Sequence, residues 1–105
     1  TTIHLALLIE DDVISGLTLI KKKFKNNEAL QIRGMFTISD FCCKGYGSQL
    51  VKYVKSKFLI NEIKYLWCNS RFEAINFYKK NDFKETGNFF IKKKIGKHKK
   101  LYFEL

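Results

Sequence analysis

Lys44, Gly45 and Gly47 are the first residues in this chain whose types and spacing could bind a ligand. They follow an apolar run and precede a segment with helical spacing. Glycines let the backbone turn sharply and approach a ligand closely, and free N–H groups at a helix start favour an anion. Lys44 adds a positive charge. The loop is therefore a candidate phosphate cradle, although a plain glycine-rich helix entry has the same pattern.

Two well-known phosphate motifs and a metal site are excluded by the spacing. A Walker loop would need GxxxxGK[ST], which is absent. A dinucleotide fingerprint, GxGxxG, would need a glycine at position 50, which is Leu50. Cys42, Cys43 and Cys68 form no CxxC or Cys/His ligand pattern, so we expect no metal and reduced thiols in the cytoplasm.

Three strands that form an antiparallel meander are predicted before the loop. They cover residues 3–9, 13–24 and 30–38, with turns at 10–12 and 25–27. From Gly47 onward, apolar residues at helical spacing predict an amphipathic helix of about three turns. Residues 63–68 predict a fourth strand. A strand–helix–strand unit implies that the third and fourth strands are parallel.

A second helix is predicted after the fourth strand. Ser70 and Glu73 have the form of a capping box at its start. Its apolar stripe is Ala74, Ile75 and Tyr78. Asn81 and Asp82 end it, because both side chains tolerate turn geometry.

A closing hairpin completes the chain. Residues 83–95 and 100–105 predict its strands, with a turn near 96–99. The order β-β-β-α-β-α-β-β predicts an α/β fold with a mixed, mostly antiparallel sheet. At 105 residues, the chain is expected to form a single domain over residues 1–105.

The charge balance points to an anionic ligand or partner. The net charge is +10, from 20 Lys and Arg against 10 Asp and Glu. The chain lacks the RNA-recognition signature of aromatic residues on paired strands, so nucleic acid is not favoured. No apolar run reaches the ~20 residues of a membrane span.

Two lysine clusters, at residues 21–27 and 92–100, are expected at the end of the sheet away from the glycine loop. An acidic acceptor or partner could bind there. Exposed lysines that keep hairpins from pairing edge to edge would look the same.

Four motifs in order resemble the GNAT superfamily of N-acetyltransferases. They are residues 32–37 (IRGMFT), 44–47 (KGYG), 66–71 (LWCNSR) and 76–83 (NFYKKNDF). Their spacing and strand order match the family over nearly the whole chain. The resemblance implies acetyl-CoA as acyl donor and a fourth strand that splays from the third, leaving a V-shaped gap for the thioester.

The resemblance also implies a role for particular residues. The third strand would pair with the pantetheine arm of acetyl-CoA, and the glycine loop would hold its pyrophosphate. The implied cofactor-binding residues are Met35, Phe36, Thr37, Lys44, Gly45, Tyr46, Gly47, Ser48 and Asn69. Tyr78 matches the general acid that protonates the departing thiolate, a role that suits a phenol, although a core aromatic at helical spacing has the same pattern.

The chain departs from the family at several places. Cys42 stands where an Arg or Gln usually opens the phosphate loop, Gln31 where some members have a basic Glu, and Asp82 where a glycine is common. The family's usual first strand and one or two helices have no counterpart before Thr1. The general base is left open between His98, His4 and a water route to solvent.

We therefore expect an acetyl-CoA-dependent N-acetyltransferase. A primary amine of a small molecule or protein would attack the thioester directly, and a homodimer is possible. The alternative is a non-catalytic domain that binds acyl-CoA or a protein partner.

Overall fold

The computed structural model describes residues 2–58 and 62–105. Its elements in chain order are β1 (Thr2–Ile9), β2 (Asp12–Lys21), β3 (Ala29–Thr37), the 3-10 turn η1 (Ser39–Phe41), α1 (Tyr46–Phe58), β4 (Tyr65–Arg71), the 3-10 turn η2 (Phe72–Ala74), α2 (Ile75–Lys80), β5 (Lys84–Lys92) and β6 (Gly96–Glu104). The predicted α/β fold and the predicted order of strands and helices are confirmed.

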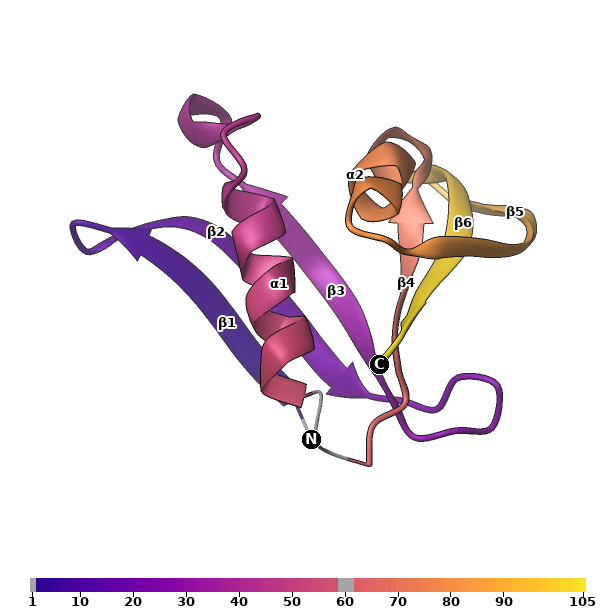
Figure 1. Ribbon diagram of the computed structural model, residues 1–105. Helices are drawn as coiled ribbons and strands as arrows, with labels where there is room; N and C mark the ends of the chain where they lie inside the picture. The colour runs from indigo at the N-terminus through magenta and orange to yellow at the C-terminus, as the bar shows by residue number, and fades with distance from the viewer. Residues whose placement is uncertain (1, 59–61) are drawn as a thin grey trace.

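The six strands form one sheet in the order β1-β2-β3-β4-β6-β5. All neighbours are antiparallel except β3 and β4, which are parallel as the sequence predicted. Figure 1 shows α1 crossing in front of β2 and β3, and α2 standing above β4. The two helices contribute to a single apolar core with one face of the sheet.

The parallel ladder between β3 and β4 is short, and the strands separate beyond it. It runs from the pair Ala29 and Tyr65 to the pair Ile32 and Cys68. Beyond this point β3 pairs with β2, and β4 pairs with β6. Figure 1 shows the two strands diverging toward their carboxyl ends. The sheet therefore has a V-shaped opening whose apex lies at Ile32 and Cys68, as the resemblance implied.

A bulge turns β3 as it leaves the ladder. Arg33 pairs with Thr18 and Phe36 with Gly16, so β3 gains one residue relative to β2. Gly34 has φ +59°, a left-handed conformation that glycine adopts without a Cβ penalty. The extra residue changes which side chains face the helices. Met35, rather than Phe36, lies against α1.

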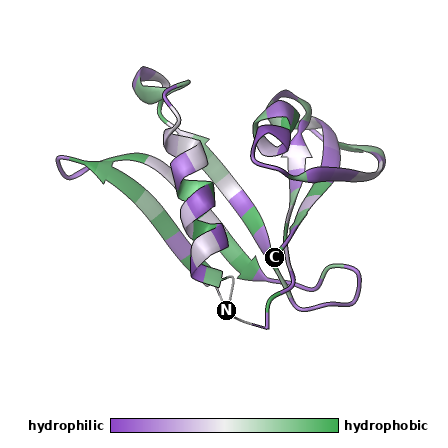
Figure 2. Cartoon of the chain, in the orientation of Figure 1, coloured by the Kyte–Doolittle hydropathy of each residue, from purple (hydrophilic) through white to green (hydrophobic). Residues whose placement is uncertain are grey.

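The amphipathic pattern of α1 is confirmed. Its buried residues are Gly47, Leu50, Val51 and Val54, which recur at helical spacing. Figure 2 shows hydrophilic and hydrophobic residues alternating along this helix. The buried side chains pack on apolar residues of β2, β3 and β4. This packing fixes the amino end of α1 beside the open end of the V.

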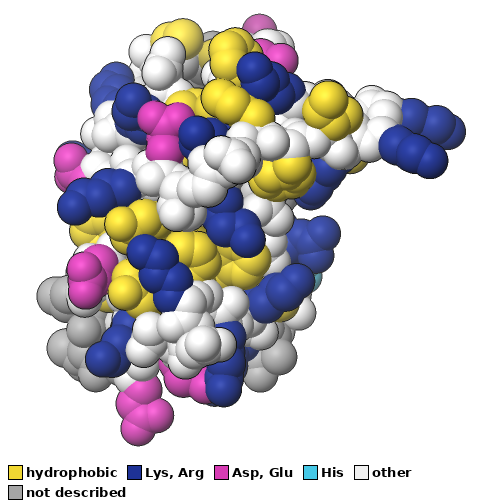
Figure 3. Space-filling view, turned by 90° about the vertical axis from the view of Figure 1, so that its right-hand side faces the viewer, with side chains coloured by type: hydrophobic (Ala, Val, Ile, Leu, Met, Phe, Trp, Pro, Cys, Tyr) yellow, Lys and Arg dark blue, Asp and Glu magenta, His cyan; other side chains and the backbone are white. Residues whose placement is uncertain are grey.

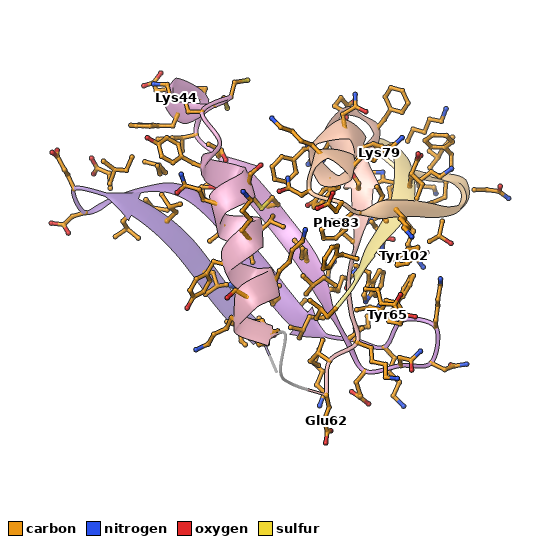
Figure 4. All side chains as sticks on the ribbon, in the orientation of Figure 1. Lys44, Glu62, Tyr65, Lys79, Phe83 and Tyr102 are labelled. Carbon is orange, nitrogen blue, oxygen red and sulfur yellow. The ribbon has the colours of Figure 1, made fainter. Side chains whose placement is uncertain are left out.

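A second, aromatic cluster lies on the other face of the sheet. Phe24 and Trp67 stack with ring centroids 5.6 Å apart, and Tyr65 and Tyr102 pack against them. Trp67 alternates along β4 with Leu66 and Cys68, which belong to the helix-covered core. Figure 4 shows Tyr65 and Tyr102 near the turn between β2 and β3.

The predicted capping box at Ser70 is wrong. β4 continues to Arg71, and Ser70 pairs with Lys99 of β6 within the sheet. The Ser70 hydroxyl donates to the backbone oxygen of Arg71, and α2 begins after Ala74 without a side-chain cap. Cross-strand pairing over three more residues outweighs one local capping bond. The predicted helix end at Asn81 and Asp82 is confirmed, and Asp82 has φ +71°.

Two strand limits also differ from the prediction. β2 ends at Lys21 instead of residue 24, and Phe24 forms an isolated bridge with Asn27. The closing hairpin turns at residues 93–95 instead of 96–99, because Gly96 to Lys99 pair with β4 and β5.

The expected place of the second lysine cluster is wrong. β6 runs antiparallel to β4, and His98 pairs with Arg71 at the carboxyl end of β4. The hairpin tip at residues 93–95 therefore lies at the same end of the sheet as the glycine loop. The first cluster, at residues 21–27, does lie at the opposite end, before β3.

Asn81 connects the two helices. Its Nδ2 donates to the Ser48 hydroxyl at 3.1 Å and to the Phe77 backbone oxygen at 2.9 Å. Its own backbone oxygen accepts a hydrogen bond from Lys55 Nζ. Burial lowers the pKa of Lys55, and nearby Asp82 partly opposes this effect. Because α2 has only six residues, these bonds hold it in place better than its own turns can.

We predict that Asn81→Ala destabilises the fold by about 1–3 kcal/mol, because it leaves buried polar groups without partners. The measurement is the free energy of unfolding from urea titration. Asn76→Ala is the matched control, since Asn76 is exposed on the same helix, and it should change stability by less than about 0.5 kcal/mol. Equal stabilities for both variants would contradict the role of Asn81.

Candidate active site

Tyr78 lies at the apex of the V. Its side chain is buried and interacts with the side chain of Cys68, the last residue of β4 that pairs with β3. The rings of Phe77 and Phe83 pack beside it, with centroids 5.2 and 5.3 Å from that of Tyr78. The predicted general acid is therefore also a core residue, and the two interpretations of its position are compatible.

The environment keeps the Tyr78 hydroxyl and the Cys68 thiol, both at the apex, protonated. Burial raises the pKa of the Tyr78 hydroxyl well above its usual value, and the neighbouring Cys68 raises it further. Burial raises the pKa of the Cys68 thiol to about 12, although hydrogen bonds with Tyr78 and with the Leu101 backbone lower it in part. At neutral pH, Tyr78 is a neutral phenol with a proton to donate, and Cys68 is an inert thiol.

The carboxyl-terminal half of β3 presents a free backbone edge to the V. Met35, Phe36 and Thr37 lie beyond the parallel ladder, and the pairing of this segment is with β2 on its other side. The buried Ser15 hydroxyl donates to the Phe36 backbone oxygen at 2.7 Å and lies 3.0 Å from the Thr37 hydroxyl. The edge is therefore held extended, in the form that an added strand-like arm would need.

The loop before α1 has the geometry of an anion site. Gly45 has φ +86° and its backbone oxygen accepts the first helical hydrogen bond, from Gln49. The N–H groups of Tyr46, Gly47 and Ser48 therefore have no acceptor within the helix. The first turn of α1 contains no acidic residue. Lys44 stands at this end of α1 in Figure 4.

Gly47 allows three elements to meet at the mouth of the V. A Cβ at this position would lie 3.1 Å from the Phe77 ring and 3.2 Å from Met35 Cε. Met35 comes from β3, Gly47 from α1 and Phe77 from α2. Ser48, one residue further, is held by Asn81 through its hydroxyl. Its N–H group has no acceptor within the helix, and its hydroxyl, which accepts the bond from Asn81, keeps its own proton to donate.

Cys42 closes the loop back onto β3. Its thiol lies 3.6 Å from the Thr37 backbone oxygen and 3.5 Å from that of Ile38. The side chain is exposed, and its neighbour Cys43 has φ +63°. The Cys42 thiol therefore contacts the backbone at the end of β3 and the start of the loop.

Asn69 carries an unsatisfied polar atom at the edge of the opening. It follows Cys68 in β4, and its buried Oδ1 has no hydrogen-bond partner among the described residues. A buried acceptor without a donor costs about 1–3 kcal/mol, so such atoms often mark a ligand position. The contact between Asn69 and a cofactor stays a prediction, and Oδ1 is the atom that would accept the ligand's hydrogen bond.

The candidate bases lie in different places. His4 is exposed on β1, 2.9 Å from the Thr18 hydroxyl. His98 is buried in β6, with Nδ1 2.8 Å from the Gly96 backbone oxygen and its ring stacked on Phe90. Gln31, which is not a candidate base because an amide does not accept a proton, is buried in β3 beside Trp67.

The structure brings the predicted site residues together at one end of the sheet. Met35, Phe36 and Thr37 form one wall, Asn69 lies on the other, the segment from Lys44 to Ser48 lies at the mouth, and Tyr78 lies at the apex. Over residues 2–58 and 62–105 there is no cluster of three metal-ligating side chains. No helix in this part of the chain is long and apolar enough to cross a membrane.

Phe77 and Asn81 are site-supporting residues that sequence reasoning missed. Both stand within the 76–83 motif, but nothing in the spacing shows that Phe77 reaches Gly47 or that Asn81 reaches Ser48. An asparagine just after a helix is common as a cap, so its second role gives no separate signal.

The order of elements and the diverging parallel strands match the fold of the GNAT family of acetyltransferases. The family model described as Acetyltransferase (GNAT) domain matches residues 2–85, and the chain belongs to this family. A curated relative is the uncharacterized N-acetyltransferase YitI of Bacillus subtilis (strain 168), which is 32% identical over 74 residues. That match covers 70% of this chain and 50% of the relative, so the chain spans about half the length of the relative.

Solved structures share the fold at low sequence identity. Aminoglycoside 6'-N-acetyltransferase complexed with coenzyme A has a TM-score of 0.81 and 11% identity, covering 98% of this chain and 72% of that chain. A GNAT family acetyltransferase from Elizabethkingia anophelis with acetyl-CoA bound has a TM-score of 0.76 and 19% identity, covering 97% of this chain and 75% of that chain.

We predict that the three cysteines differ sharply in reactivity. Cys42 and Cys43 are exposed, whereas Cys68 is buried with a thiol pKa raised to about 12. Titration of the native protein with a coloured disulfide reagent at neutral pH should count two fast thiols, and the third should react only after unfolding. Cys68→Ala is the control and should leave the fast count at two. Three fast thiols in the native protein would show that the apex is open to solvent.

Proposed function

We propose that this chain is an acetyl-CoA-dependent N-acetyltransferase that uses Tyr78 as general acid. The observation that carries the proposal is the V between β3 and β4, with a neutral phenol at its apex and, at its mouth, a helix terminus whose first N–H groups have no acceptor within the helix. CoA or acetyl-CoA is bound by solved structures of the same fold. Family membership supports the same chemistry.

The residues at the opening fit an acyl-CoA thioester. The N–H groups of Tyr46, Gly47 and Ser48, with Lys44 beside them, would hold the pyrophosphate. The free edge at Met35, Phe36 and Thr37 would pair with the amides of the pantetheine arm. Asn69 Oδ1, which lacks a partner in the described structure, would accept a hydrogen bond from an amide of that arm.

The chemistry divides between donor and protein. Bound acetyl-CoA supplies an activated acyl thioester, whose carbon–sulfur bond is exchanged for a carbon–nitrogen bond to the amine. Tyr78 donates its hydroxyl proton to the departing thiolate and regains one from solvent, to which the amine has lost its own. Because the pKa of Tyr78 is raised, its proton is present over the whole neutral and mildly alkaline range.

We predict that acetyl-CoA raises the melting temperature of the protein, since a ligand that binds the folded state stabilises it. Gly45→Ala should weaken acetyl-CoA binding about tenfold. The left-handed conformation of the loop is about 1–2 kcal/mol less favourable for alanine than for glycine. The fold should survive, since no atom lies within 4 Å of the added Cβ.

The matched control is Gly96→Ala, which strains a glycine with φ +103° in equally open space at the β5–β6 turn. It should bind acetyl-CoA as the wild type does. No melting shift of the wild type at millimolar acetyl-CoA would remove the proposed function.

We predict that Tyr78→Phe lowers kcat about 10²- to 10⁴-fold, the usual worth of general acid catalysis. The change removes one hydroxyl and keeps the ring that packs on Phe77 and Phe83. Thiol release with a panel of primary amines measures kcat, and a thermal shift measures acetyl-CoA affinity, which should stay within about twofold of the wild type.

Phe83→Leu is the control for core packing beside Tyr78, and it should lower stability more than kcat. Full activity of Tyr78→Phe would eliminate the general-acid role. Binding of acetyl-CoA without turnover of any amine would favour the non-catalytic alternative.

A further inference from the structure

A basic, aromatic pocket lies on the face of the sheet opposite the helices. Its volume is about 470 Å³. It is lined by Lys23, Phe24, Lys25, Trp67, Thr86, Gly87, Asn88, Phe90 and Lys100. Figure 3, which views the molecule from the right-hand side of Figure 1, shows hydrophobic side chains with Lys or Arg side chains around them. The roles assigned above to the glycine loop and to Tyr78 do not use these residues.

The pocket is built by two irregular segments. The turn between β2 and β3 brings Lys23 and Lys25 over the sheet, and the Trp67 indole nitrogen donates to the Lys22 backbone oxygen of this turn at 3.0 Å. On the other side, β5 carries a bulge between Thr86 and Phe90, with Gly87 at φ +74°. The bulge bends β5 away from a regular ladder and forms the second wall.

The lining has positive charge and no acidic side chain. Lys100 Nζ lies 5.0 Å from the centre of the Trp67 ring, and Lys25 Nζ lies 4.1 Å from that of Tyr102. Neither lysine forms an ion pair with a carboxylate of the described residues, whereas Lys23 shares Glu28 with Lys21. Two cations are therefore held over aromatic rings with no carboxylate to neutralise them.

The pocket lies beside the proposed site on β4. Trp67 and Asn69 point to the same face of β4, one pleat apart, and Lys100 pairs directly with Asn69 across the ladder. A ligand seated on Trp67 would therefore lie next to the edge of the V. The pocket and the glycine loop approach that opening from opposite faces of the sheet.

We propose that this pocket binds the amine acceptor, and that the acceptor carries a carboxylate or phosphate on an apolar or planar body. The proposal rests on the proposed function for the identity of the reacting group. The lysines recognise the anion, and the floor of Phe24 and Trp67 takes the apolar body. The acceptor's amine then reaches the V beside Asn69.

The single tryptophan of the chain makes the pocket directly observable. Trp67 forms its floor, so indole fluorescence reports a bound ligand without acetyl-CoA and without turnover. The probes are two matched pairs of primary amines. The first pair is 4-(2-aminoethyl)benzoate against phenethylamine, and the second is O-phosphotyramine against tyramine. In each pair the anionic member should change the fluorescence at about tenfold lower concentration. The two pairs separate carboxylate from phosphate recognition.

Lys25→Gln and Lys100→Gln should each weaken binding of the preferred anionic probe about three- to tenfold. In turnover they should raise KM for that amine by the same factor and leave the affinity for acetyl-CoA unchanged. Lys57→Gln makes the same change of charge at an exposed position of α1, outside the pocket, and should alter neither value.

Three results would overturn the proposal. Equal fluorescence responses to the members with and without the anionic group, in both pairs, would remove anion recognition. Equal losses of probe affinity in Lys57→Gln and Lys100→Gln would show that binding depends on the net charge of the protein and not on the pocket. A response to single-stranded RNA but to none of the small amines would assign the aromatic face to nucleic acid. Since these measurements need no acetyl-CoA, they can fail while the melting shift with acetyl-CoA succeeds, and the reverse.

Discussion

The early end of the parallel ladder between β3 and β4 is the constraint on which the rest of the structure depends. Only four residue pairs join these strands. The two halves of the sheet therefore depend on pairing with β2 on one side and with β6 on the other to keep their positions. The bulge at Gly34 directs β3 toward β2, and β6 holds β4 through seven pairs. The ladder's end leaves a backbone edge free, places Cys68 at an apex and gives Tyr78 its position.

The helices must keep the V from closing or spreading, and they do so with few contacts. α1 is anchored by its apolar stripe, but α2 has only six residues and little stability of its own. Asn81 therefore matters more than a usual cap, because it binds Ser48 of α1 and accepts a hydrogen bond from Lys55. Phe77 and Met35 meet over Gly47 and set the separation of helix and strand.

Much of this arrangement could be predicted from the sequence, where the signal was a period or a family motif. The stripe of α1 and the order of the strands follow from periodicity, the glycine loop follows from its residue types and spacing, and the predicted role of Tyr78 follows from the family motif. The prediction of a capping box at Ser70 was wrong because Ser70 pairs with β6 in the sheet, and the local sequence does not reveal that pairing. Phe77, Asn81 and the Trp67 pocket depend on contacts between distant segments, which one-dimensional spacing does not encode.

A site divided between two faces, as we propose, would give the net charge of +10 a physical meaning. Lys44 and the free N–H groups of α1 would attract an anion at the mouth of the V, on the side of the helices. Lys25 and Lys100, which lie over aromatic rings, would attract a second anion on the other face. If the two anions entered from one side, they would repel each other; with the sheet between them, both can be attracted while only their uncharged reacting ends meet. The apex suits that meeting, because burial there keeps Tyr78 and Cys68 neutral.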